Sequence, residues 1–188
     1  MLKPLAFFLT TLPLMSGCAT TTSPVPAPAS LRPLIEAVGQ RADVANDVAL
    51  SKWYSGKAVQ DSEREQQVIL NAENQATTYG LAKDDVRRFM TAQIEANKQV
   101  QYARIAQWHA TAQVPAEPAA SAFQGIRARL DTLQPVMMQK YAAFLPWQHD
   151  AACPDWVQAE IHRHTSDPII VTAMQTATAT LCSAPGKA

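Results

Sequence analysis

The stretch QRADVANDVALSKWYSGKAVQDSEREQQV, from Gln40 to Val68, decides the fold and the chemistry expected of this chain. Its apolar residues recur at helical spacing until Ser55-Gly56 interrupts the pattern, and Asp61 then begins a second helix with an acid-rich first turn. Arg41 and Lys52 lie eleven residues apart, which is three helical turns plus about 20°. Both cations therefore project from one helix face, which would otherwise be buried in a core.

Helical spacing continues through the rest of the chain after residue 30, and no strand pattern interrupts it. Pro33 suits the first turn of a helix, whereas Pro135 would kink or interrupt the helix that contains it. The expected helices are 31–54, 61–78, 84–109, 122–144, a shorter one that opens at Cys153-Pro154, and one that Asp167 caps and that runs to about Cys182. The sequence therefore predicts an all-α, single-domain bundle of about six helices.

The composition limits the number of domains and excludes several kinds of site. A chain of 188 residues with 47% hydrophobic content can bury one core, and a formal net charge of zero argues against a nucleic-acid binder. The histidines of His162-Arg163-His164 point to different helix faces, and no cysteine or carboxylate set accompanies them at ligand spacing. No glycine pattern suits a phosphate-binding loop or a nucleophile elbow. We therefore expect no metal and no cofactor.

The tryptophans are interpreted as core or helix-packing aromatics. They are Trp53, Trp108, Trp147 and Trp156.

The N-terminal residues predict export from the cytoplasm. Residues 1–17 contain one lysine, a short apolar run and a small-residue end, and are too short for a stable membrane span. Cys18 follows Leu14-Met15-Ser16-Gly17, which resembles a bacterial lipobox, so Cys18 is a candidate lipidated N-terminus. Ordinary cleavage near Ala19 is the alternative. Residues 18–30 are rich in threonine, proline, serine and alanine and are expected to form a flexible tether, with the globular domain at 31–188.

Cys153 and Cys182 remain as an even pair once Cys18 is set aside. In an exported chain this arrangement favours a disulfide, with two free thiols as the alternative.

The motifs resemble those of the all-helical chorismate mutase family. An arginine, a lysine eleven residues later, an aspartate that opens the next helix and an arginine in its first turn are shared. QIEANKQVQY at Gln93–Tyr102, RARLD at Arg127–Asp131 and the late cysteine pair resemble the secreted, periplasmic branch. The resemblance covers nearly everything after residue 30. It implies the conversion of chorismate to prephenate by an intramolecular Claisen rearrangement.

The resemblance also implies a role for each residue along the four motifs. Arg41 would bind a substrate carboxylate, Lys52 would reach a carboxylate and the ether oxygen, and Gln101 would contact the ether oxygen. Arg64 would contribute positive potential and a hydrogen bond, and Asp61 and Glu65 would lie near the ring hydroxyl. Asn97 and Arg127 would each bind a substrate carboxylate.

Arg127 distinguishes two branches of the family. Small cytosolic members complete their site with an arginine from the partner's first helix, seventeen residues before the position of Arg41, where this chain has Pro24. Secreted members use an arginine from added C-terminal helices, and Arg127 fits that pattern. The resemblance therefore implies a homodimer with one complete site in each protomer. The neighbouring Arg129 is an alternative to Arg127.

Other interpretations stay open at this stage. An isochorismate-pyruvate lyase would share the bundle and the cationic site, and a helical lipoprotein could bind carboxylates without turnover. Asp61 and Glu65 could contact the substrate or serve only as helix caps. Asn97 and Gln101 could be ordinary exposed amides.

Overall fold

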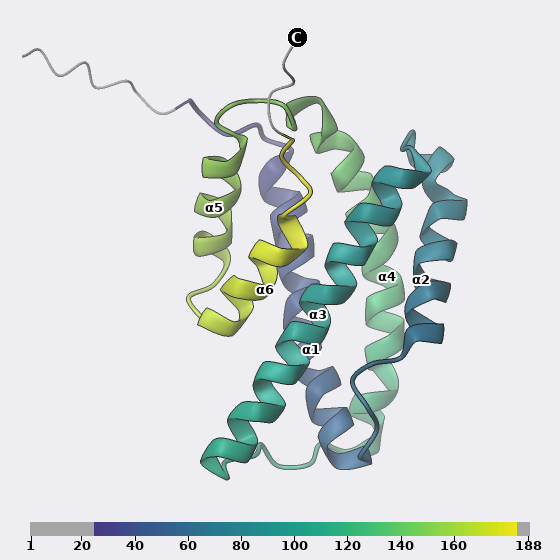
Figure 1. Cartoon of the computed structure of the whole chain (residues 1–188), viewed down its shortest axis with the longest axis vertical. Coiled ribbons are helices and arrows are strands. Elements are labelled where there is room, and N and C mark those ends of the chain that lie inside the picture. The colour runs from purple at the N-terminus through teal and green to yellow at the C-terminus, as the bar shows by residue number, and fades with distance from the viewer. Residues whose placement is uncertain (1–24, 184–188) are drawn as a thin grey trace, which may run out of the picture.

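The computed structural model describes residues 25–183, which form six α-helices and two short 3₁₀ helices (Figure 1). Their bounds are α1 Leu31–Ser55, α2 Ser62–Gln75, η1 Ala76–Tyr79, α3 Lys83–Thr111, α4 Ala120–Phe144, η2 Leu145–Trp147, α5 Cys153–His164 and α6 Pro168–Thr178. No strand occurs within residues 25–183. The predicted all-α bundle of six helices is confirmed. The predicted export segment, Cys18 and most of the predicted tether lie outside the described residues.

Local sequence signals fix several helix ends. Asp61 Oδ1 accepts a hydrogen bond from the Arg64 backbone N–H at 3.2 Å and caps α2, and Asp167 Oδ1 accepts one from Ile169 N–H at 2.9 Å and caps α6. Gly56 ends α1 with a φ of 67°, a left-handed conformation that glycine adopts without steric cost. These three ends lie where the sequence predicts them.

Two other predicted ends differ from the structure, and one predicted interruption does not occur. The α-helical part of the second helix stops at Gln75 and continues as η1 to Tyr79. Pro135 does not interrupt α4, which runs to Phe144 as predicted. The turns after Pro135 bury Met137, Met138, Tyr141 and Phe144, and this burial outweighs the lost backbone hydrogen bond. The last helix ends at Thr178 rather than at Cys182. The Leu181 N–H bonds the Thr178 carbonyl at 2.9 Å in a turn that brings Cys182 to Cys153.

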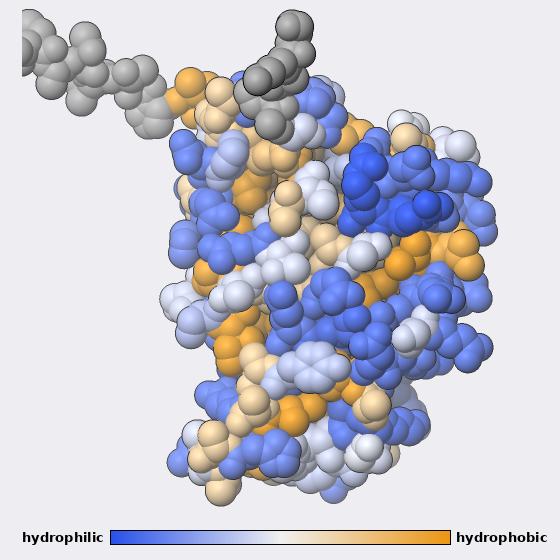
Figure 2. Space-filling model, viewed as in Figure 1, coloured by the Kyte–Doolittle hydropathy of each residue, from blue (hydrophilic) through white to orange (hydrophobic). Residues whose placement is uncertain are grey.

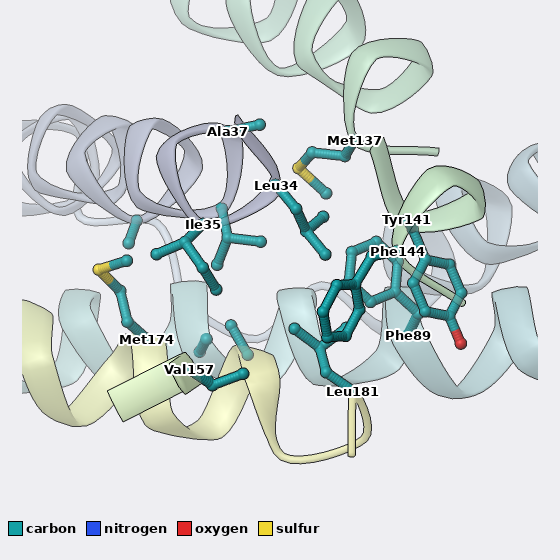
Figure 3. Close-up of a cluster of buried hydrophobic side chains, with 14 of the residues drawn as sticks. Leu34, Ile35, Ala37, Phe89, Met137, Tyr141, Phe144, Val157, Met174 and Leu181 are labelled. Carbon is teal, nitrogen blue, oxygen red and sulfur yellow. The ribbon is translucent and has the colours of Figure 1, made fainter. Parts of the chain in front are cut away.

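The main core lies where α1, α3, α4, α5 and α6 meet (Figure 3). Phe89 of α3 stacks on Tyr141 of α4 with ring centroids 4.4 Å apart. Leu34 of α1, Phe144 of α4 and Leu181 complete this part of the cluster and are fully buried. Helices α1 and α3 are thus the central elements, and each contributes a face to the core.

The tryptophans pack as predicted at three of their four positions. Trp108 is buried in a second cluster with Ala49 and Leu50, and Trp53 meets it edge to face at 5.7 Å. Trp156 is buried and donates from Nε1 to the Val25 carbonyl at 2.7 Å. The prediction is wrong for Trp147, which is 44% exposed, because η2 is a surface connection between α4 and α5.

A disulfide joins Cys153 and Cys182, with their Cα atoms 5.8 Å apart. It ties the first residue of α5 to the segment that follows α6, and so confirms the predicted pairing. On the chain-entropy model a loop of this length is worth about 3 to 4 kcal/mol of stability.

The face shown in Figure 2 carries mostly hydrophilic side chains, with apolar patches between them. Within residues 25–183, no helix is both long enough and apolar enough to cross a bilayer.

At Gly39, the side chain of His164 from α5 lies close against α1. A Cβ atom at this position would lie 2.3 Å from Nε2 of His164 and 2.5 Å from its Cε1. The same imidazole Nε2 lies 3.3 Å from Asp43 Oδ2, one turn further along α1. The last residue of α5 therefore rests directly on the backbone of α1, which only glycine permits.

We expect Gly39→Ala to destabilise the protein by roughly 1 to 3 kcal/mol, because the ring of His164 must move away. Gly125→Ala in α4 is the matched control. Apart from its chain neighbours and the nearby backbone of its own helix, no heavy atom of the described chain lies within 4 Å of the new Cβ, so alanine should stabilise the helix by about 0.5 to 1 kcal/mol. Urea unfolding followed by circular dichroism gives both values. Adding His164→Ala to Gly39→Ala should recover part of the loss, and an equal response of both glycines would contradict the close approach.

Candidate active site

A cavity of about 460 Å³ opens between α1, the first turns of α2, the middle of α3 and the first half of α4. Its volume lies within the range typical of small-molecule sites. All eight residues that the resemblance assigns to the substrate line it: Arg41, Lys52, Asp61, Arg64, Glu65, Asn97, Gln101 and Arg127. Four segments that are distant in sequence thus bring these side chains together within one chain.

Helix α1 contributes a buried guanidinium to this cavity. Arg41 is 6% exposed, and its Nε has no hydrogen-bond partner among residues 25–183. Burial lowers the pKa of Arg41 to about 10, and the negative charge of Asp131 opposes this shift. The group therefore stays cationic at neutral pH. Lys52 lines the same cavity from the last turn of α1, as the eleven-residue spacing predicts.

Helix α3 lines the cavity with residues at i, i+3, i+4 and i+7, which are Ile94, Asn97, Lys98 and Gln101. Gln101 Nε2 donates to Asn97 Oδ1 at 2.7 Å, and Asn97 Nδ2 donates to the Arg41 carbonyl at 3.4 Å. Both amides are buried, so they are not ordinary exposed side chains. Gln101 Oε1 lacks a hydrogen-bond partner in the described part of the chain.

The start of α2 combines helix capping with the cavity wall. Asp61 caps the helix through the Arg64 N–H, and Glu65 Oε1 accepts from the Asp61 N–H at 3.2 Å. The other oxygen of Glu65 lies 3.0 Å from Lys98 Nζ. Both carboxylates therefore have partners within the protein while they line the cavity.

The two arginines that the sequence leaves as alternatives lie on different sides of α4. Arg127 lines the cavity, together with Phe123, Ile126 and Leu130, which supply apolar surface. Arg129 instead pairs with Asp47 of α1 at 2.6 Å and lines a different groove. The two arginines are two positions apart on one helix and point to different sides, so Arg127 is the one that lines the cavity.

Several lining residues were not predicted from the sequence. Lys98 and Asp131 are the charged ones, and Asp131 lies 3.5 Å from Arg64 Nη2. The spacing of Lys98 from Ile94 and Gln101 on one helix face is a signal that could have identified it. With both included, five cations and three carboxylates of the described chain line the cavity. The excess of two positive charges suits a dianionic ligand.

The histidines do not form a metal site in the described residues. Residues 25–183 contain no group of three or more histidine, cysteine, aspartate or glutamate side chains that could hold a metal ion. His109 packs on Trp53 with ring centroids 4.6 Å apart, and His164 contacts Asp43.

We expect Arg41→Met to raise the stability of the ligand-free protein by about 1 to 2 kcal/mol, since methionine keeps the aliphatic stem and removes a desolvated charge. Asp131 would not be left buried and unpaired, because its side chain is 61% exposed and contacts Arg64. Arg64→Met is the matched control and should change stability by less than about 1 kcal/mol, as that ion pair is at the surface. Urea unfolding without ligand measures both. A clear destabilisation by Arg41→Met would mean that this guanidinium supports the fold.

Comparison with known proteins identifies the family. Residues 32–102 match the family described as Chorismate mutase type II. A protein named secreted chorismate mutase from Mycolicibacterium smegmatis is 33% identical over 174 residues, which cover 89% of this chain and 94% of the relative. A second protein of that name, from Mycobacterium tuberculosis, is 28% identical over 159 residues, or 82% of this chain and 79% of the relative.

A solved structure shares the fold. The crystal structure of a chorismate mutase from Burkholderia phymatum superimposes with a TM-score of 0.77 at 35% identity, over 82% of this chain and 96% of that one. The similarity extends along most of the sequence, and it is consistent with the six helices and the Cys153–Cys182 disulfide of the structure. The chain therefore belongs to the all-helical, secreted chorismate mutase family.

Proposed function

We propose that this chain catalyses the rearrangement of chorismate to prephenate in the cavity lined by α1, α2, α3 and α4. The observation that carries the proposal is the excess of two positive charges around a buried pair of amides, Asn97 and Gln101, all within one chain. Chorismate has two carboxylates and an ether oxygen that gains negative charge as its C–O bond breaks. The cavity offers cations for the carboxylates and neutral hydrogen-bond donors for the ether oxygen.

The reaction needs restraint and charge stabilisation rather than a nucleophile. A C–C bond forms as the ether C–O bond breaks within one molecule, so catalysis consists of holding the chair-like conformer and stabilising the developing charge. Planar guanidinium groups suit the carboxylates, and an ammonium or amide suits a single oxygen. In our proposal Arg41 and Arg127 bind carboxylates, and Lys52 reaches a carboxylate and the ether oxygen.

Gln101 is the second donor to the ether oxygen in this proposal. Its Nε2 donates to Asn97 Oδ1 at 2.7 Å and to the Asn97 backbone carbonyl at 3.4 Å. The second of these bonds is long, so its hydrogen can be given to the substrate instead. Because Asn97 Nδ2 donates to the Arg41 carbonyl, Asn97 turns its oxygen toward Gln101 and thereby fixes the amide end that donates. The second N–H of Asn97 remains for a substrate carboxylate.

The start of α2 is the proposed binding site of the ring hydroxyl. Glu65 and Asp61 line the cavity there and are already held by hydrogen bonds to the backbone of the first turn. Arg64, which is partly exposed and contacts Asp131, adds positive potential at the rim. These assignments give each of the eight predicted residues a place around one substrate.

The proposed enzyme is exported and homodimeric, with a complete site in each protomer. The cavity is lined from α1, α2, α3 and α4 of a single chain, which supports a site that needs no residue from a partner. Two relatives are named as secreted, and a disulfide suits an oxidising compartment. Residues 1–17 would be the export segment, residues 18–30 the tether, and residues 31–188 the enzyme domain, with Cys18 either lipidated or lost by ordinary cleavage near Ala19.

A spectrophotometric assay of chorismate loss, with prephenate identified as the product, tests the proposal. Isochorismate is the second substrate to offer, because release of pyruvate from it would favour the lyase alternative. No turnover of either compound would favour a carboxylate-binding protein.

The two arginines of α4 provide a matched pair of variants. Arg127→Ala removes a proposed carboxylate ligand and should lower kcat/KM by roughly 10²-fold or more, whereas Arg129→Ala should leave it within about threefold. Lys52→Ala, which removes a donor at the developing charge, should lower kcat by about 10²- to 10³-fold. Steady-state kinetics and circular dichroism of each purified variant are the measurements. Equal losses in the two arginine variants would refute the assignment of Arg127.

The direction in which activity changes with pH tests the proposed role of Gln101 as a donor to the ether oxygen. An amide donates at any pH, while a carboxyl group donates only when protonated, with an ordinary pKa of about 4.3 for glutamic acid. The wild type should therefore keep a nearly constant kcat between about pH 5 and 8, since the amide of Gln101 does not titrate. Gln101→Glu should lose activity at neutral pH and recover part of it on acidification. A variant whose activity rises with pH would show that Gln101 does not face the breaking bond.

A further inference from the structure

Lys98 is a cation of the cavity to which no role has been given above. Its side chain is 11% exposed, and Nζ lies 3.0 Å from Glu65 Oε2 and 2.8 Å from Glu95 Oε1. The hydrogen bond to Glu95, followed by that to Glu65, raises the pKa of Lys98 although burial opposes the shift. The ammonium is therefore charged at neutral pH, and two of its three donors are engaged by carboxylates of the protein.

The Glu65 carboxylate is held at both oxygens. Oε1 accepts from the Asp61 N–H at 3.2 Å, and Oε2 accepts from Lys98 Nζ. Its side chain is 20% exposed and lines the cavity, so the carboxylate faces a ligand while its conformation is fixed from two elements, α2 and α3. Each carboxylate oxygen keeps a further lone pair that can accept a hydrogen bond.

We infer that Lys98 is a positioning residue, which fixes the Glu65 carboxylate at the cavity wall as the acceptor for the ring hydroxyl of the substrate. This inference rests on the proposed function. Without the ammonium, Glu65 would lose its charge partner on α3 and could turn toward solvent, and binding would then have to restrict a mobile side chain.

Loss of Lys98 is expected to change KM and not kcat. The ring hydroxyl keeps its charge and its bonds during the rearrangement, so its contact with Glu65 has the same strength in the bound substrate and in the transition state. Loss of such a uniform contact raises KM and leaves kcat nearly unchanged. This distinguishes Lys98 from Lys52, whose loss should lower kcat.

A double-mutant cycle on the whole exported chain tests the inference, with Lys98→Met, Glu65→Gln and the pair combined. Lys98→Met should raise the KM for chorismate roughly tenfold to hundredfold with kcat within about threefold, as expected for a lost hydrogen bond to a charged group. If Lys98 acts through Glu65, the combined variant should be no worse than Glu65→Gln alone. Lys98→Arg keeps a cation and should retain most of the affinity.

Two controls separate this role from a loss of folding. Lys83→Met removes the same kind of side chain from an exposed position at the start of α3, and should leave both kinetic constants unchanged. Circular dichroism and thermal unfolding check each variant, and Lys98→Gln replaces Lys98→Met in the cycle if the latter does not fold.

Three results would overturn the inference while leaving the proposed function intact. They are an unchanged KM in Lys98→Met, a loss confined to kcat, and losses that multiply in the combined variant, since multiplication would mean that Lys98 contacts the substrate itself. A wild-type protein that does not rearrange chorismate would overturn the proposed function, and this inference with it.

Discussion

The burial of the Arg41 guanidinium in the middle of α1 is the constraint on which the site depends. The residues beside it, Val38, Ala42 and Ala45, belong to the core, and α1 packs on α3, α4, α5 and α6. Desolvation of this charge is unfavourable, and the negative charge of Asp131 offsets only part of it. A buried arginine of this kind is retained where function requires it. The Arg41 Nε–H has no hydrogen-bond partner among the described residues, and in this buried position it can bind an anion more strongly than an exposed arginine could.

Helix capping and ligand binding use the same atoms at the start of α2. Asp61 and Glu65 satisfy backbone N–H groups of the first turn, and both also face the cavity. A change in the cavity wall therefore alters the end of a helix, and the reverse also holds. Lys98 extends this coupling to α3, so the acceptor at the proposed hydroxyl site is held by two helices rather than by a loop.

The C-terminal helices support the site without lining it. Helix α5 rests on α1 at Gly39, two residues from Arg41, and α6 packs on α3, which carries Asn97 and Gln101. Gln93 Nε2 also donates to the Ala177 carbonyl of α6 at 2.7 Å. The disulfide holds α5 and the end of α6 together, and so keeps both supports in place. This arrangement leaves the opposite faces of α1 and α3 free to form the cavity with α2 and α4.

The sequence predicted the helices well because their signals are local: period, caps and glycine stops act within a few residues. It also predicted eight cavity residues, since spacing and family motifs identify a helix face. It favoured Arg127 only by resemblance and left Arg129 as an alternative, because the choice depends on which side of α4 meets α1. The contact of Lys98 with Glu95 is local, at i, i+3 on α3, but its contact with Glu65 is known only once α2 lies on α3. Local signals thus define which side chains share a helix face, whereas the packing of helices decides which of those faces a ligand meets.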